Sequence, residues 1–277
     1  MFALLSETAS KHKLYLDQKG QRTARPGKRI AWVDMYGNTH DLDFVLEKNG
    51  SDTQIGSPVA FIESAWRRYT KHSRNKAQEI QGAILPLVQT HGNHAPFIGV
   101  ILAGDFTEGA KTQLRSHRFR VLHFSYESLV ASFLTAGIDA SFNEDTADEV
   151  CAKKVRAWDN LSAKARRKLG LRLLDDNKAQ VREFVDALEA AILRQIKQIR
   201  VLPLHGATLE MESLDKAIAF VESYKENDPS PKPVAKYEIL VRYDNDDEIK
   251  GTFYQKADAL EFLRSYLPPL TPMLENE

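Results

Sequence analysis

Two acidic residues, Asp43 and Glu63, lie in short apolar segments whose alternation predicts β-strands. Side chains on a strand point to opposite faces with a period of two residues. Glu63 therefore shares a face with Phe61 and Ala65, on a strand that would otherwise be buried. A carboxylate there is costly unless it is paired or binds a metal. Two carboxylates on adjacent strands can converge on Mg²⁺, which prefers oxygen ligands, activates water and polarises phosphoryl groups.

A basic segment follows Glu63. Residues 66–76 contain five lysines and arginines and no acidic residue. Cations beside a metal site are what a phosphodiester substrate requires. We therefore expect nucleic-acid contacts from four of these residues: Arg67, Arg68, Lys71 and Arg74.

Other interpretations of these residues stay open. Glu63 could form an ion pair with Arg67 or Arg68, because buried charges are usually paired. Asp43 could be a strand-end residue bound to backbone or to a lysine. The basic segment could be a solvated helix start. The Arg-rich loop of residues 20–28 is expected to be solvated, and its cations are a weaker candidate for DNA contacts.

The elements that must position Asp43 and Glu63 follow from the order of apolar runs. Residues 2–19 are predicted to form a helix and residues 28–48 a hairpin, followed by a strand carrying Glu63 and a helix over residues 73–88. Two apolar runs of strand length then alternate with helices, which indicates right-handed crossovers and parallel pairing. The predicted fold class is α/β, with a mixed β-sheet flanked by helices.

This stretch resembles the PD-(D/E)XK nuclease superfamily over roughly residues 28–135. Asp43 in LDFVLE is followed twenty residues later by Glu63 in FIESAW, and then by helix, strand, helix and strand. The resemblance implies a restriction-endonuclease-like core in which Asp43 and Glu63 bind Mg²⁺. The lysine that the family places two residues after the second acid falls on Ala65 in this sequence.

Some members of the superfamily supply that lysine from the following helix. The resemblance therefore makes Lys76 the first candidate for the catalytic cation and Lys71 the second. Glu79 lies about one helical turn beyond Lys76 and can share its face. It is a candidate for a further acidic ligand, as in some family members.

Composition limits the possible partners. The 277 residues contain 38 basic and 38 acidic residues, so there is no global attraction to nucleic acid and any DNA contact must be local. The single cysteine, Cys151, fits a reducing compartment. No apolar run approaches the roughly 20 residues that a membrane helix needs, and the N-terminus does not resemble a signal peptide. We expect a cytoplasmic protein without membrane contacts.

The C-terminal part contains an internal repeat. KAIAFVESY at 216–224 matches DALEFLRSY at 258–266, and each copy follows strand-like sequence. We therefore predict three parts: a nuclease-like α/β domain (1–144), a helical segment (145–196) and a small α+β repeat module (197–277) for target recognition or dimerisation.

The residues themselves predict metal-assisted phosphodiester hydrolysis, and the resemblance implies a Mg²⁺-dependent DNA endonuclease that acts in restriction or defence. A homodimer is expected, because double-strand cutting needs two active sites. The alternative is a catalytically inactive nuclease-fold protein that binds nucleic acid or a protein partner. In a third interpretation, Asp43 and Glu63 are structural residues of an unrelated α/β protein.

Overall fold

The computed structural model describes residues 2–203, 209–225, 234 and 236–267. The chain divides into two compact units, Met1–Ile192 and Leu193–Glu277. The helical segment predicted for residues 145–196 belongs to the first unit, because its last helix, α7 (Lys178–Leu193), packs into that unit's core. The second unit begins close to the boundary predicted after residue 196.

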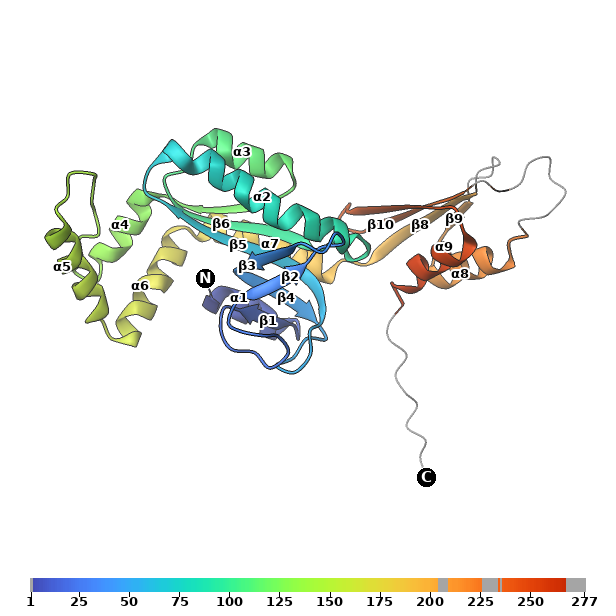
Figure 1. Cartoon of the computed structure of the whole chain (residues 1–277), viewed down its shortest axis with the longest axis horizontal. Helices are drawn as coiled ribbons and strands as arrows, with labels where there is room; N and C mark the ends of the chain where they lie inside the picture. The colour runs from blue at the N-terminus through green and yellow to red at the C-terminus, as the bar shows by residue number, and fades with distance from the viewer. Residues whose placement is uncertain (1, 204–208, 226–233, 235, 268–277) are drawn as a thin grey trace, which may run out of the picture. The chain divides into compact units, whose positions relative to one another are not determined.

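The first unit is built on a five-stranded mixed sheet with the order β1-β4-β5-β6-β7, which confirms the predicted fold class (Figure 1). β4 pairs antiparallel with β1 and β5, whereas β5, β6 and β7 run parallel. The strands are β1 (Tyr15–Gln18), β4 (Phe44–Lys48), β5 (Ser57–Arg67), β6 (Phe97–Gly104) and β7 (Arg120–Phe124). A separate hairpin consists of β2 (Ile30–Val33) and β3 (Thr39–Leu42).

The N-terminal segment differs from its prediction. A single helix over residues 2–19 is wrong: α1 covers only Phe2–Lys11, and β1 follows it. Lys13 adopts a left-handed conformation with φ of 55°, which ends the helix and turns the chain. β1 then pairs with β4, with Leu16 opposite Leu46. Strand pairing with a distant segment has overridden the local helical periodicity here.

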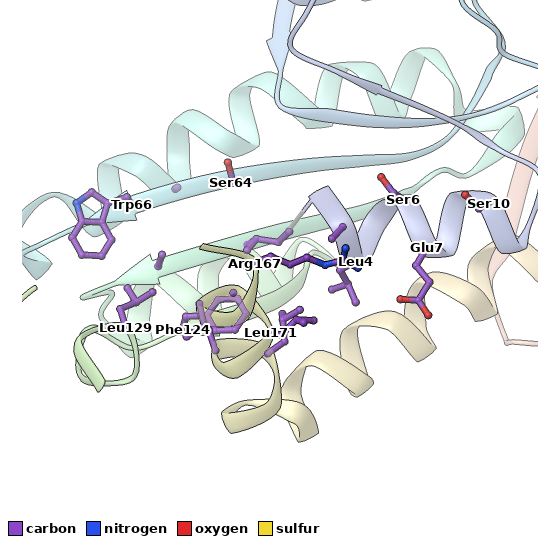
Figure 2. A pocket seen from close by; sticks show the side chains of 17 residues that line it. Leu4, Ser6, Glu7, Ser10, Ser64, Trp66, Phe124, Leu129, Arg167 and Leu171 are labelled. Atoms are coloured by element: carbon purple, nitrogen blue, oxygen red, sulfur yellow. The ribbon is translucent and has the colours of Figure 1, made fainter. Parts of the chain in front are cut away.

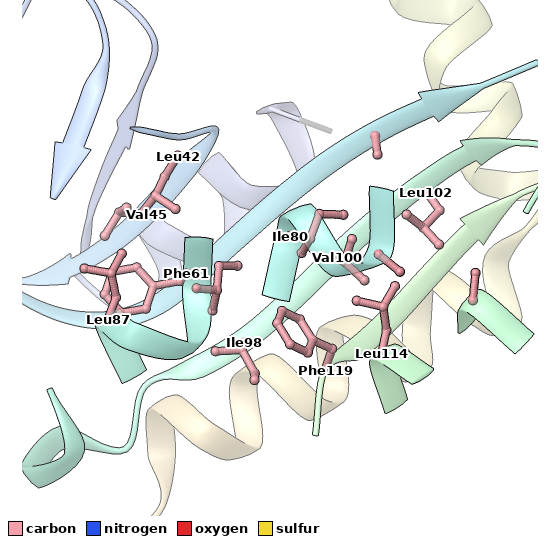
Figure 3. Close-up of a cluster of buried hydrophobic side chains, with 14 of the residues drawn as sticks. Leu42, Val45, Phe61, Ile80, Leu87, Ile98, Val100, Leu102, Leu114 and Phe119 are labelled. Atoms are coloured by element: carbon pink, nitrogen blue, oxygen red, sulfur yellow. The ribbon is translucent and has the colours of Figure 1, made fainter. Parts of the chain in front are cut away.

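Helices cover both faces of this sheet. α2 (Ser73–Thr90) and α3 (Glu108–Ser116) pack on one face, and the core cluster between them includes residues of β4, β5 and β6 (Figure 3). α1 and α7 pack on the other face. The remaining helices of the unit are α4 (Tyr126–Leu134), α5 (Asp148–Asp159) and α6 (Ala163–Asp176).

The alternation along β5 determines where Glu63 points. Phe61 and Ala65 belong to the cluster under α2, whereas Ile62 belongs to the cluster on the opposite face. Since neighbouring side chains of a strand alternate between faces, Glu63 points towards α2 and Ser64 points away from it. The two-residue period of the sequence predicted this placement.

Two arginines of the Arg-rich loop are buried, although most other residues of the loop are exposed. Arg22 is 2% exposed and binds Asp17 at 2.8 Å and Glu47 at 2.6 Å, and Arg25 binds Asp17 at 3.0 Å. For these two arginines, the expectations of solvation and of DNA contacts are therefore wrong. Their charges neutralise two buried carboxylates and fix the loop against β1 and β4, as buried ions require.

The second unit confirms the predicted repeat. Each copy is a strand–strand–helix unit, and the four strands form one antiparallel sheet with the order β11-β10-β8-β9. The elements are β8 (Ile196–Pro203), β9 (Leu209–Met211), α8 (Leu214–Ser223), β10 (Tyr237–Tyr243), β11 (Glu248–Phe253) and α9 (Lys256–Arg264). The Pro-rich segment of residues 225–234 lies mostly outside the described residues.

Equivalent residues of the two copies meet each other. Ile199 of β8 lies opposite Val241 of β10, and Glu222 binds Arg264 at 2.6 Å. Both pairs are separated by 42 residues, which is the period of the repeat. A residue can contact its own equivalent only near a two-fold axis, so the module is pseudo-symmetric about these pairs.

Candidate active site

The structure brings Asp43 and Glu63 together. Asp43 is the residue between β3 and β4, and Phe44 opposite Ile62 is the first pair of the β4–β5 ladder, so Asp43 lies beside Glu63. The backbone N–H of Asp43 donates to Glu63 Oε1 at 3.2 Å. Asp43 Oδ2 accepts hydrogen bonds from Ser64 N at 2.8 Å and from Ser64 Oγ at 2.7 Å. The two carboxylates therefore occupy adjacent positions where the hairpin joins the sheet.

Glu63 is buried, with 9% of its surface exposed. Burial, and secondly the negative charge of Asp43, raises the pKa of Glu63 to about 8. The hydrogen bond from Asp43 N and the charge of Lys76 oppose this shift, while Glu79 adds to it. Such surroundings favour the neutral form of the carboxyl group. A bound cation would favour the ionised form instead.

No lysine or arginine in the described part of the chain forms an ion pair with Glu63. The ion pair with Arg67 or Arg68 that the sequence left open is not formed: Arg67 donates to the carbonyl of Trp66, and Arg68 pairs with Asp105 at 2.8 Å. This removes one of the structural interpretations of Glu63.

Each of the other buried carboxylates among the described residues has a basic side chain as a partner. Asp17 and Glu47 bind Arg22. Asp34 Oδ2 lies 2.9 Å from His40 Nε2, and this contact lowers the pKa of Asp34. Among the buried carboxylates of the described residues, Glu63 alone has no basic side chain as a partner. Since buried charges are normally paired or bind metal, this contrast marks Glu63 as a functional candidate.

Lys76 comes from the first turn of α2, above the face on which Glu63 lies. Its Nζ is 2.5 Å from Glu79 Oε1, and its side chain is 17% exposed. Its charge is close enough to Glu63 to lower the pKa of that carboxyl. Lys71 lies in the 3-10 turn Thr70–His72 and is exposed. Of the two lysines, Lys76 is the one whose charge acts on Glu63.

Ala65 cannot supply a cation, and its 8% exposed side chain packs in the core under α2. Glu79, the candidate further ligand, is 64% exposed and paired with Lys76. Nowhere in the described ranges do three or more His, Cys, Asp or Glu side chains gather so as to hold a metal. Glu79 is thus not part of a three-carboxylate set with Asp43 and Glu63.

Two carboxylates still fit the needs of Mg²⁺. This ion keeps several waters and is usually bound through one or two carboxylates together with phosphate oxygens of a substrate. Asp43 Oδ1 and Glu63 Oε2 accept no hydrogen bond from any described residue, so one oxygen of each carboxylate is available. The donor set suits a hard cation that a phosphodiester would help to hold.

Three of the four residues predicted to contact nucleic acid have a positive charge that is not paired with a described acidic residue. Within the described residues, Arg67, Lys71 and Arg74 have no acidic partner. Arg68 differs: it binds Asp105, donates to the carbonyl of Phe142 at 2.9 Å and lies 3.7 Å from the centre of the Tyr126 ring. This arrangement favours a structural role for Arg68, which ties the end of β5 to the loop after α4.

The raised pKa of Glu63 predicts a pH-dependent stability in the absence of metal. In the folded chain this carboxyl is neutral below about pH 8, whereas its ordinary pKa is 4.5. Folding therefore retains a proton between these values, and stability falls as the pH rises from about 4.5 to about 8. Glu63→Gln removes this loss.

We expect Glu63→Gln and wild type to unfold alike at about pH 5, and the variant to be more stable by about 2 kcal/mol at about pH 9. Urea unfolding in EDTA measures the difference. A difference that does not change with pH would show that Glu63 ionises normally in the folded chain.

Comparisons with known proteins give no assignment. No family model and no curated protein matches the chain. A solved structure, "Crystal Structure of Protein of Unknown Function AF1548", is similar with 13% sequence identity and a TM-score of 0.30, over 68% of this chain and 95% of that chain. A likeness at this level carries no argument about activity. Among the described residues, no helix has the length and apolarity needed to cross a membrane.

Proposed function

We propose that this chain is a Mg²⁺-dependent DNA endonuclease that hydrolyses phosphodiester bonds, in restriction or defence. The observation that supports this most is Glu63, a buried carboxylate without a cationic partner among the described residues, lying beside Asp43 and within the electrostatic reach of Lys76. The fold supports the proposal only in general terms, because a mixed α/β sheet hosts many functions.

Each residue of the site has a separate task in this proposal. Asp43 and Glu63 would hold the ion through their available oxygens, with Glu63 in its deprotonated form. When bound, Mg²⁺ supplies Lewis-acid activation of water and of the phosphoryl group. Lys76 directs its Nζ at the charge that develops on the phosphoryl oxygens. Ser64 fixes Asp43 through two hydrogen bonds to Oδ2.

Substrate binding is local in this proposal, because the net charge of the chain is zero. Arg67, Lys71 and Arg74 follow Glu63 and are not neutralised by described acidic residues. Contacts of this kind track the phosphate backbone without reading sequence. Binding is therefore expected to weaken steeply with salt.

Incubation of the purified chain with supercoiled plasmid tests the proposal. Nicked or linear product is expected with Mg²⁺, and none with EDTA. DNA binding without cleavage in Mg²⁺ or Mn²⁺ would support the alternative of a nuclease-fold binding protein, for which Ala65 at the family's lysine position is the motivating residue. Neither binding nor cleavage would support the structural interpretation of Asp43 and Glu63.

We also propose a homodimer, with the helices of residues 145–196 or the repeat module at its interface. Exposed apolar side chains favour the helices as the interface: in α5, Val150 is 42% exposed and Val155 is 58% exposed. Light scattering is expected to give twice the monomer mass, and Val155→Glu is expected to shift the chain towards monomer. A strict monomer, both free and bound to DNA, would contradict this prediction.

A further inference from the structure

A cavity of about 710 Å³ lies within the first unit, between α1, α6 and the sheet (Figure 2). Much of its lining is apolar, with Leu4 of α1, Ile101 of β6 and Leu171 of α6 among the residues. A volume between roughly 300 and 1,000 Å³ is typical of sites for small organic ligands. Neither Asp43 nor Glu63 lines this cavity, so the proposed cleavage site does not account for it.

The cavity adjoins the candidate active site through β5. Ser64 lines the cavity, and its hydroxyl donates to Asp43 Oδ2 at 2.7 Å. The β4–β5 ladder begins at Ile62, so residues 64–67 lie beyond β4 along that edge of β5. Ser64 therefore links the candidate site to the cavity, because it contacts Asp43 and lines the cavity as well.

An exposed aromatic ring stands at the end of the cavity nearest this edge. Trp66 is 43% exposed, which is unusual for a large ring on a sheet, and it contacts Tyr126 on its covered side. Figure 2 shows Trp66 at one end of the cavity and Glu7 towards the other, with Arg167 between them. Stacking on aromatic rings is a common way for proteins to bind unpaired bases.

The cavity also carries a cation. Arg167 lines it, and no acidic side chain of the described residues forms an ion pair with this guanidinium. Lys164 and Lys168 on the same helix are likewise without acidic partners in the described part of the chain. In contrast, Arg172 of α6 is paired with Asp176. Glu7 of α1 also lines the cavity, so the positive charge of Arg167 and its neighbouring lysines marks the part of the cavity that complements a phosphate.

We propose that this cavity binds an unstacked nucleoside next to the cleaved phosphate, with its base against Trp66 and a phosphate against Arg167. This inference rests on the proposed endonuclease function and deepens it. The nucleoside has left the base stack, because a planar ring system cannot enter the cavity while it is paired in a duplex. Stacking and apolar contact are tolerant of base identity, so the cavity selects unpaired bases rather than a sequence.

Gly170 provides a way to close the cavity. It lines the cavity in the middle of α6, and a Cβ at this position would meet no atom within 4 Å. Gly170→Trp therefore adds a large ring at the lining of the cavity without a clash at Cβ, and is designed to obstruct it. Gly82 of α2 is the matched control, because it is also helical, has the same open space and does not line the cavity.

The test compares binding of two fluorescent single-stranded oligonucleotides of equal length in EDTA, one of deoxythymidine and one abasic. We expect wild type and Gly82→Trp to prefer the oligonucleotide with bases by about tenfold or more, the scale of one stacked base. Gly170→Trp is expected to remove this preference. Arg167→Gln is expected to weaken the binding of both oligonucleotides. Trp66→Ala gives the same loss of preference and serves as the second variant if Gly170→Trp does not fold.

Equal binding of the two oligonucleotides by wild type would overturn the inference, as would an undiminished preference in Gly170→Trp with a native circular dichroism spectrum. Plasmid cleavage by the same preparations separates this result from the proposed function. If wild type cleaves but shows no base preference, the cavity proposal fails alone. If it shows the preference but never cleaves, the endonuclease proposal fails while base binding in the cavity stands.

Discussion

Asp43→Asn and Glu63→Gln are each expected to reduce Mg²⁺-dependent cleavage by about a thousandfold or more. A metal ion contributes several kcal/mol of charge stabilisation to such a transition state, and each 1.4 kcal/mol corresponds to about a tenfold change in rate. Both amides preserve the size of the side chain but lose the charge that holds the ion. Single-turnover cleavage of a labelled duplex measures the rates, and urea unfolding shows whether each variant remains folded.

Asp41→Asn is the matched control for these variants. Asp41 lies two residues before Asp43 on β3, but it is exposed and pairs with Arg29 at 2.8 Å. Exposed pairs of this kind contribute little to stability, and Asp41 has no contact with Glu63. We expect this variant to cleave at the wild-type rate. If Asp43→Asn or Glu63→Gln did the same, the substituted residue would not belong to the site.

Lys76→Ala is expected to lower the cleavage rate by about a hundredfold or more, with only a small loss of DNA affinity. This is the scale observed when one donor to a developing oxyanion is removed. Ala65 supplies no cation two residues after Glu63, whereas the charge of Lys76 acts on Glu63. The expected result is thus a large change in the rate at saturating DNA and a small change in the dissociation constant.

Lys71→Ala is the comparison for this prediction. Lys71 is exposed in the turn before α2, and no described acidic residue pairs with it. Lys71→Ala should weaken DNA binding and reduce the dependence of binding on salt by about one phosphate contact. The cleavage rate should change little. The opposite pattern would assign the catalytic role to Lys71. Unchanged turnover in both variants would favour the binding-protein alternative.

The fold was predictable from sequence where the apolar period was continuous. Three features were predictable in this way: the buried run of β6, the alternation around Glu63 and the 42-residue repeat. Each is a regular pattern of apolar residues along the chain. β1 was not predictable in this way, because its four residues become a strand only by pairing with β4. A left-handed turn at Lys13 gives no signal in a helical period.

The candidate site was predictable only in part. The two-residue period placed Glu63 on the correct face, since register follows from the pleat, whereas Asp43 lies in a break between β3 and β4 rather than within one strand. The partners of the arginines could not be read, because Arg68 binds the carbonyl of Phe142, which lies 74 residues away. Similarly, the cavity combines Trp66 with Arg167, and no local pattern in the sequence joins residues so far apart. Such contacts depend on how the elements pack.

Divalent-ion binding tests the central claim, that Asp43 and Glu63 form one metal site, most directly. Mn²⁺ can be titrated into the chain in the presence of a DNA duplex and followed by electron paramagnetic resonance at about pH 9, where Glu63 is ionised. We predict that wild type and Asp41→Asn bind one ion per chain with similar affinity, and that Asp43→Asn and Glu63→Gln lose it. Equal Mn²⁺ binding by wild type and Glu63→Gln, or no binding by wild type, would contradict the account.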